Sequence, residues 1–414
     1  MSFAKLGLSA ELLAEIHRQG YSKPTPIQYQ VIPAILKGQD ILATAETGTG
    51  KTASFCLPII QLLSATIINH PRLIRGLILV PTRELALQIQ NDLQPYILSI
   101  GINSAVIIGG MNIHAQLKKL HRGIDIIIAT PGRLLELIST AMIELSALKY
   151  VVIDEADRLL DLGFTPSVNQ IIQQLPNQRQ TLLFSATFPK SIQLLAEKIL
   201  QNPLIIRLNE NHKIATQIEQ LVYPIKAEYK HELLAYWIQH YRWSQVLVFV
   251  RTKQIAERLM KQLIAQGIRS ATLHSDKNQT ERVTVLNWFI AGRITALIAT
   301  DIAARGLDIE QLAQVVNYDL PIIAEDYIHR IGRTGRAGYS GLAWSLVCPE
   351  QIEQLIAIEK LLKQQIPRIV NTGYESVSLM PQIKNKTVSK PNSKRLEEYN
   401  NRHHFSAKRG AKSR

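Results

Sequence analysis

The part of the sequence with the clearest chemistry is a glycine-containing turn that follows a short apolar run at residues 41–44. The turn consists of Ala45, Glu46, Thr47, Gly48, Thr49, Gly50, Lys51 and Thr52. Glycines allow backbone N–H groups to face phosphate oxygens, and the start of the helix predicted to follow adds partial positive charge. Lys51 is then placed to reach the β- and γ-phosphates of a nucleotide, and the Thr52 hydroxyl to ligate Mg²⁺. The pattern predicts a phosphate-binding loop, with Ala45 where a glycine is usual.

Two neighbouring carboxylates, Asp154 and Glu155, follow another apolar run at residues 150–153. A carboxylate at the end of a strand can hold Mg²⁺ through water, and its neighbour can orient and deprotonate an attacking water. The structural alternative is an acidic helix start, which the helix dipole favours in any protein. Because the chain also has a phosphate-binding loop, we assign Asp154 to the metal and Glu155 to the water.

Three arginines at three-residue intervals, Arg330, Arg333 and Arg336, lie among glycines in the second half of the chain. Phosphoryl transfer is accelerated by a cation that stabilises the charge developing on the γ-phosphate, and such an arginine contributes about 10³–10⁵ in rate. We predict that Arg333 and Arg336 supply this charge. If they act across a cleft, hydrolysis requires the two halves of the chain to close around the nucleotide.

These residues follow one repeated pattern, in which a short apolar run leads into a polar turn and then into a helical pattern. Continuous apolar runs of this length are typical of parallel strands buried on both faces. Such runs occur at residues 41–45, 77–80, 105–108, 126–130, 150–153 and 181–185, and again at 246–250, 270–273, 296–300, 315–318 and 343–347. The sequence therefore predicts two doubly wound α/β lobes with parallel sheets. Ligands of such sheets bind outside the carboxyl ends of the strands.

The predicted lobes span residues 1–208 and 217–367, and the polar segment 209–216 between them is predicted to be a linker. Apolar periodicity stops after Pro367, so residues 368–414 are predicted to form a disordered basic tail. The chain has a net charge of +14, and residues 384–414 contain ten Lys or Arg and two Glu. This surplus of positive charge favours a polyanionic partner.

Several other classes of protein are excluded by composition. No run approaches the roughly 18 apolar residues that a membrane-spanning helix needs, and the N-terminus lacks the apolar region of a secretory signal. The two cysteines, Cys56 and Cys348, are far apart and lack metal-ligand spacing. Neither a disulfide framework nor a zinc module is therefore predicted. We expect a cytoplasmic protein without a membrane partner.

The order of these motifs resembles that of the DEAD-box ATP-dependent RNA helicases, a family whose name is spelled by residues 154–157. The resemblance covers about Phe3 to Leu362 and looks strongest to the bacterial RhlE-type subgroup. It implies two RecA-like lobes, ATP and Mg²⁺ as cofactors, and RNA-stimulated ATP hydrolysis coupled to lobe closure. It also implies local, non-processive unwinding or remodelling of RNA duplexes and RNA–protein complexes. A monomer is expected, with ribosome-assembly or RNA-degradation proteins as candidate partners.

Residues 20–28 look like the Q motif of this family, in which the Gln28 amide contacts the adenine edge. A glutamine amide can donate and accept at once, as adenine requires. The ring of Tyr21 or Phe3 would stack on the base, and Lys23 belongs to the same ATP-binding segment. By the same resemblance Asp308 would bind the ribose.

Further motifs look like the RNA-contacting loops of the family, because they follow strands and carry donor groups that phosphates accept from. They comprise Pro81, Thr82, Arg83, Gly109, Gly110, Thr130 and Arg133 in the first lobe, and Arg251, Gln279, Arg282 and Thr300 in the second. Ser185 and Thr187 look like the motif that couples hydrolysis to strand separation. Ser275 and Ile255 depart from the commoner family pattern, which has a glycine and a small residue at these positions.

Two alternatives share these signals. A DNA-directed superfamily-2 translocase has the same phosphate-loop, acidic and arginine motifs, and a nucleotide-gated RNA clamp would hold strands without unwinding them. The presence of Glu155, Arg333 and Arg336 favours an active enzyme over a clamp. The sequence does not identify the RNA target.

Overall fold

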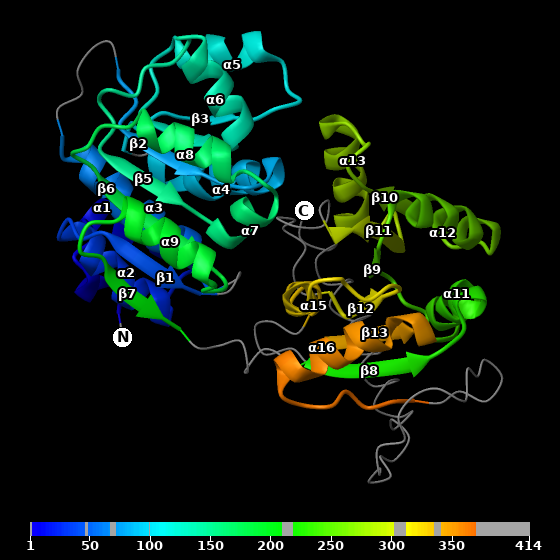
Figure 1. Cartoon of the computed structure of the whole chain (residues 1–414). Helices are drawn as coiled ribbons and strands as arrows, with labels where there is room; N and C mark the ends of the chain where they lie inside the picture. Colours follow the sequence, from blue (N-terminus) through cyan, green and yellow to red (C-terminus); the bar gives the residue numbers. More distant parts are fainter. Residues whose placement is uncertain are drawn as a thin grey trace. The chain divides into compact units, whose positions relative to one another are not determined.

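The computed structural model describes residues 2–45, 49–66, 72–98, 100–208, 218–301, 312–334 and 341–369. Contacts within the chain divide it into two compact units, the first running to residue 210 and the second beginning at residue 211. Figure 1 shows that each is an α/β lobe built on its own sheet. The predicted linker, and the predicted tail from residue 370 onward, lie outside the described residues.

The first lobe contains a seven-stranded sheet in the order β3-β4-β2-β5-β6-β1-β7, and its neighbouring strands pair in parallel. The strands are β1 (Ile41–Thr44), β2 (Gly76–Leu79), β3 (Ser104–Ile107), β4 (Ile126–Ala129), β5 (Tyr150–Ile153), β6 (Gln180–Ser185) and β7 (Leu204–Arg207). All except β7 coincide with predicted runs. β7 was not predicted because it is a short edge strand in which only Ile206 is buried.

Helices cover both faces of this sheet because alternate strand residues point to opposite sides. One face, with Ile78 and Val152, packs against α1–α4, and the other, with Leu79 and Ile153, packs against α5–α9. After the 3₁₀ turn η1 (Phe3–Leu6), the helices are α1 (Ala10–Arg18), α2 (Pro26–Leu36), α3 (Lys51–Ser64), α4 (Arg83–Leu98), α5 (Ile113–Leu120), α6 (Pro131–Ser139), α7 (Ala156–Asp161), α8 (Thr165–Gln173) and α9 (Lys190–Ile199).

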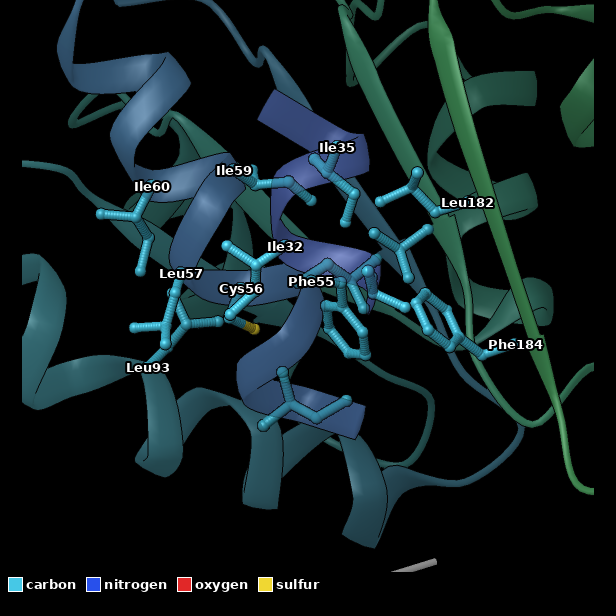
Figure 2. Packing of buried hydrophobic residues seen from close by; sticks show 14 of the residues in the cluster. Ile32, Ile35, Phe55, Cys56, Leu57, Ile59, Ile60, Leu93, Leu182 and Phe184 are labelled. Atoms are coloured by element: carbon cyan, nitrogen blue, oxygen red, sulfur yellow. The ribbon is translucent and has the colours of Figure 1, made fainter. Parts of the chain in front are cut away.

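Helix α3, which follows the phosphate-binding loop, is anchored in the core of the first lobe. Figure 2 shows its apolar residues packed between α2, α4 and strand β6. Phe55 lies against Phe184 of β6, with their ring centroids 5.1 Å apart. Cys56 is buried in the same cluster, and this burial raises the pKa of its thiol. The buried face of α3 therefore fixes the position of its first residue, Lys51.

The second lobe contains a six-stranded parallel sheet in the order β10-β11-β9-β12-β13-β8. The strands are β8 (Ile218–Pro224), β9 (Val246–Val250), β10 (Ser270–Leu273), β11 (Ala296–Thr300), β12 (Gln314–Asn317) and β13 (Gly341–Val347). Five match predicted runs. The sequence did not reveal β8, because Glu219 and Gln220 interrupt its apolar residues at the sheet edge. The prediction of two tandem α/β lobes is confirmed.

Most of the second lobe's helices pack onto the faces of its sheet. Helices α11 and α12 cover one face, and α15 and α16 cover the other near β13 and β8. Their bounds, with the remaining elements, are η2 (Ala227–Tyr229), α11 (Lys230–His240), α12 (Lys253–Ala265), α13 (Gln279–Ile290), α15 (Ala324–Ile331), η3 (Pro349–Gln351) and α16 (Ile352–Leu362). The ordered chain continues into the predicted tail, since Arg368 bridges to Val222 and pairs with Glu359.

Parallel pairing places the predicted site residues along one edge of each sheet. In the first lobe Thr44 pairs with Ser185 and Ile153 with Leu79, so the loops after these strands are neighbours. The nucleotide motifs follow β1, β5 and β6, and the RNA motifs follow β2, β3 and β4, so the two sets occupy separate halves of the edge. No helix within the described ranges is long and apolar enough to cross a membrane.

Candidate active site

The phosphate-binding loop begins where β1 ends. The N–H of Ala45 donates to the Ser185 carbonyl at 3.0 Å, which extends the pairing of β1 and β6 by one residue. Gly50 has a φ of +88°, in the left-handed region that favours glycine, and immediately precedes α3. Thr49 and Thr52 are partly buried, whereas Glu46, Thr47 and Gly48 lie outside the described residues. The described part of the loop therefore has the strand, turn and helix that phosphate binding requires.

Lys51 and Asp154 form a buried pair beside this loop. The Lys51 Nζ atom lies 3.9 Å from the Asp154 Oδ1 atom, and both side chains are buried. Burial raises the pKa of the Asp154 carboxyl to about 6, although the Lys51 ammonium acts in the opposite direction. The carboxylate is therefore mostly ionised at neutral pH but incompletely compensated, and additional positive charge beside it would be stabilising.

Glu155 adopts a strained backbone conformation at the start of α7. Its φ is 48° and its ψ is 51°, in the left-handed region that non-glycine residues seldom adopt. Its carboxylate is buried 3.4 Å from the Arg158 guanidinium. Such strain is commonly held at functional sites. Glu155 is the N-cap of α7, so this conformation lies at the junction between β5 and the helix, next to Asp154.

Asp157 connects the acidic segment to the segment after β6. One of its carboxylate oxygens accepts from the N–H of Ala186 at 3.1 Å and from the N–H and hydroxyl of Thr187 at 2.8 and 2.9 Å. The predicted coupling residue Thr187 is thus held directly by the acidic segment. The second predicted coupling residue, Ser185, is fully buried, and its hydroxyl lacks a hydrogen-bond partner within the described ranges. Sequence analysis gave Asp157 no separate role, since its partners lie about 30 residues later in the sequence, after β6.

The side chains at this site suit Mg²⁺. The Thr52 hydroxyl and the Asp154 carboxylate are oxygen donors, which Mg²⁺ prefers, and the buried carboxylate lacks full charge compensation. Within the described residues no cluster of three His, Cys, Asp or Glu side chains is arranged to hold a metal by itself. This is compatible with Mg²⁺, which usually keeps several waters and binds substrate phosphates.

The Q-motif residues lie directly against the phosphate-binding loop. The Gln28 amide oxygen accepts from the Thr25 N–H at 2.9 Å, and its NH₂ group donates to the Gly50 carbonyl at 3.2 Å. These contacts connect α2 to the loop, and the contact of Gln28 with adenine stays a prediction. A Cβ atom on Gly50 would lie 2.5 Å from the Gln28 nitrogen, so this position accommodates only glycine without rearrangement.

The two aromatic candidates for stacking on the base differ in exposure. Phe3 is buried in the hydrophobic core, whereas the Tyr21 side chain is 53% exposed. The ring of Phe3 is already covered by apolar neighbours, whereas the ring of Tyr21 is accessible, and stacking on the base stays a prediction. Lys23, in the same segment, is exposed.

The predicted RNA-contacting residues of the first lobe lie together. The Arg83 guanidinium lies so close to Gly110, whose φ is +75°, that a Cβ atom there would collide with it. Arg133 donates to the Met111 carbonyl at 3.4 Å and pairs with Glu136 at 2.9 Å. Pro81, Thr82 and Thr130 are buried beside them at the ends of β2 and β4, and Gly109 precedes Gly110.

Gln116 supports this cluster and was not predicted. Its buried amide accepts from the N–H of Ile108 at 3.0 Å and donates to the carbonyls of Ile108 and Met111 at 3.1 and 3.4 Å. The loop that contains Gly109 and Gly110 is therefore held at both ends by one side chain. A lone glutamine on a helix gives no sequence signal for such a role.

The predicted RNA contacts of the second lobe are only partly accessible. Arg251 is exposed after β9, and Thr300 is partly buried at the end of β11. Gln279 and Arg282 are both buried on α13, and Arg282 donates to the His274 carbonyl at 3.5 Å. Through this contact Arg282 supports the loop after β10, and contact of Gln279 and Arg282 with RNA stays a prediction.

The arginine segment after β12 contains Arg330, Arg333 and Arg336. The first two are buried, and the third lies outside the described residues. Arg330 is buried and makes two hydrogen bonds to Asp301, at 2.6 and 2.7 Å, so it is structural. Arg333, a predicted phosphate contact, is only 4% exposed. The other predicted contact, Arg336, and the predicted ribose ligand Asp308 lie outside the described residues.

Comparison with known proteins identifies the family. The DEAD/DEAH box helicase family matches residues 25–195, and the helicase conserved C-terminal domain matches residues 227–338. The ATP-dependent RNA helicase RhlB of Pseudomonas putida is 42% identical over 370 residues, which covers 88% of this chain and 93% of that protein. The chain belongs to the DEAD-box RNA helicase family. The RhlE-type subgroup stays a prediction.

Other DEAD-box relatives are longer or structurally known. The chain covers only 31% of the pre-mRNA-processing ATP-dependent RNA helicase Prp5 of Gibberella zeae, to which it is 40% identical over 374 residues. The structure of S. cerevisiae Dbp5 bound to RNA and ADP BeF3 has a TM-score of 0.80 and 33% identity, and the match covers 89% of this chain and 95% of that one. This likeness confirms the prediction of RecA-like lobes.

Substituting Gly50 with Ala tests whether the contact between Gln28 and the phosphate-binding loop serves nucleotide binding in this DEAD-box protein. Gly50→Ala combines a left-handed backbone with a collision, whereas the control Gly163→Ala has the same backbone (φ +78°) and open space around it. Both should destabilise the lobe by about 1–2 kcal/mol in urea unfolding. Gly50→Ala alone should weaken binding of a fluorescent ATP analogue, by about tenfold. Equal affinity in the two variants would contradict the role of the contact.

Proposed function

We propose that this protein is an ATP-dependent RNA helicase, in which RNA stimulates ATP hydrolysis and hydrolysis accompanies local separation of short duplexes. The observation that carries the proposal lies in the first lobe, where Lys51, Asp154 and Glu155 gather at the ends of β1 and β5. The Arg83–Gly110 cluster lies at the ends of the neighbouring strands of the same sheet. Dbp5, which shares this fold, binds both RNA and ADP BeF3, and this supports the same ligands here.

In the proposed reaction Lys51 binds the β- and γ-phosphates and Glu155 orients the attacking water and accepts its proton. The left-handed backbone places Glu155 directly after Asp154 at the start of α7, where its carboxylate pairs with Arg158. Thr52 and Asp154 would hold Mg²⁺, which when bound supplies positive charge that neutralises the phosphate oxygens. Because the pair of Lys51 and Asp154 is buried, its electrostatic interactions with ligands are screened less by water.

We propose that Thr187 transmits the state of the nucleotide site toward RNA. Its N–H and hydroxyl both bind the Asp157 carboxylate, two residues beyond Glu155. A displacement of the acidic segment on hydrolysis therefore changes the position of residues 185–187. The predicted partners in ribosome assembly or RNA degradation, the monomeric state and the cytoplasmic location stay predictions.

Substituting Lys51 tests the nucleotide site. Lys51→Ala should lower RNA-stimulated ATP turnover at least about 100-fold, because it removes the cation that contacts the transferred phosphate. Lys37→Ala is the control, since Lys37 is an exposed lysine at the end of α2 in the same lobe. Turnover is measured with RNA and with DNA of equal length, and a strand-displacement assay runs in parallel. Near-normal turnover in Lys51→Ala refutes the site, and equal stimulation by DNA refutes RNA as the specific partner.

A second substitution tests lobe closure. We propose that Arg336 contacts the γ-phosphate from the second lobe, so Arg336→Ala should lower kcat by about 10³-fold or more while ATP affinity changes little. Arg242→Ala, at an exposed position of the same lobe, is the control. A variant that loses ATP affinity but keeps its kcat would contradict a role limited to the transition state.

The basic tail is proposed to tether RNA through its phosphates. Replacing the ten Lys and Arg of residues 384–414 with Gln should weaken RNA binding and flatten its salt dependence, by about 0.7 in log–log slope for each lost contact with a single strand. The length of the tail is kept, so only charge changes. The affinity of this variant for ATP should be unchanged. An unaltered salt slope rejects the tether.

A further inference from the structure

One lysine of the second lobe is almost completely buried, although lysines seldom are. Lys230, the first residue of α11, is 2% exposed. Its ammonium donates to the Tyr318 carbonyl at 2.7 Å, to the Gln351 side-chain oxygen at 2.7 Å and to the Asp319 carboxylate at 3.4 Å. An ammonium group has three N–H donors, so these three acceptors use them all.

The partners of Lys230 come from separate elements. Tyr318 and Asp319 follow β12 in the middle of the sheet, whereas Gln351 ends the 3₁₀ turn η3 beyond β13. Burying an ammonium group is costly unless it is fully paired, and an apolar residue would connect the same elements without that cost. The charge is therefore better explained by what it does to Asp319 than by stability alone.

Asp319 is the centre of this buried network. One carboxylate oxygen faces Lys230, and the other accepts from the backbone N–H of Arg251 at 3.1 Å. Its backbone carbonyl separately accepts from the Arg330 guanidinium at 2.6 Å. Thus the side chain of Asp319 holds the loop after β9, while its main chain holds the arginine segment. Lys230 acts on the first of these connections.

We infer that Lys230 is a positioning residue for RNA binding. By fixing one oxygen of Asp319 it directs the other toward the Arg251 N–H, and so holds the loop that presents the exposed Arg251 side chain. The inference rests on the proposed function, in which this loop contacts RNA. It predicts that loss of the Lys230 charge weakens RNA binding but changes turnover at saturating RNA much less. The reason is that Arg330, which begins the arginine segment, stays bound to Asp301, to Asn317 and to the Asp319 main chain.

The test measures RNA-stimulated ATP turnover of the full chain as a function of RNA concentration. Lys230→Met should raise the half-saturating RNA concentration by about tenfold and change kcat by less than about twofold. The matched control is Lys226→Met, four residues earlier, where the lysine is exposed and lies 3.9 Å from Glu228. This control should behave as the unaltered protein. A lower kcat with an unchanged half-saturating concentration is what a purely structural role produces, and it overturns the inference.

Asp319→Asn provides a second route that keeps the size of the side chain and leaves Lys230 in place. Its amide cannot accept from both Lys230 and the Arg251 N–H, so this variant should also raise the half-saturating RNA concentration. In the double variant Lys230→Met/Asp319→Asn the two effects should be less than additive, because both act through one contact. Full additivity overturns the inference.

Arg251→Ala separates failure of the inference from failure of the proposed function. If Arg251→Ala raises the half-saturating RNA concentration and neither Lys230→Met nor Asp319→Asn does, the loop binds RNA without Lys230 and the inference is wrong. If RNA fails to stimulate the unaltered protein, the proposed function is wrong and the inference falls with it. A rise in all three variants supports both.

Discussion

A buried lysine and a buried carboxylate in the first lobe form the interaction on which its site depends. The 3.9 Å between the Lys51 Nζ and Asp154 Oδ1 atoms is too long for a hydrogen bond, so their described contact compensates the two charges only in part. Burial is the main cause of the raised pKa of Asp154, and the Lys51 ammonium opposes it only in part. The core beneath α3 and the pairing of β5 with β2 and β6 must hold Lys51 and Asp154 in place against the cost of burying their charges. Ligands that bring phosphates and a divalent cation would complete the compensation.

The loops at the edges of both sheets are held by buried polar side chains from other elements. Gln28 of α2 binds the phosphate loop, Gln116 of α5 binds the Gly109–Gly110 loop, and Asp157 binds residues 186 and 187. In the second lobe Asp319 holds the loop after β9 in the same way. Each of these four supporting side chains makes further hydrogen bonds of its own, as functional sites require for a defined geometry. Functional loops can therefore be polar and contain glycine while keeping a defined backbone position.

Sequence patterns predicted the fold well because parallel strands buried on both faces are continuously apolar. They failed at the edges, where three of the four residues of β7 are exposed and Glu219 and Gln220 interrupt the apolar residues of β8. The positions of Lys51, Asp154 and Glu155 followed from strand ends alone. Burial could not be predicted for Arg282 or Arg333, because a motif fixes the residue type and its loop but not the direction of the side chain.

Gln116 and Asp319 were also missed. Gln116 acts on a loop only five to eight residues earlier but carries no recognisable motif, whereas Asp319 acts on a residue 68 positions earlier in the sequence. Asp157 is part of the acidic motif recognised in the sequence, yet its contacts with residues 186 and 187 exist only because β5 and β6 are neighbours. Such roles depend on strand order. A single sequence gives strand positions but not their order, so these residues could be assigned only from the structure.

The nucleotide and RNA motifs of the first lobe belong to one rigid sheet. The N–H of Asp154 donates to the Leu79 carbonyl at 3.0 Å, two residues before Pro81, so the two halves of the edge meet at the β5–β2 pairing. A hydrogen-bonded parallel sheet packed on both faces does not allow these halves to slide past each other. Under the proposed function, nucleotide binding at one half must therefore act on RNA through the loops, as at residues 185–187, or through closure of the two lobes.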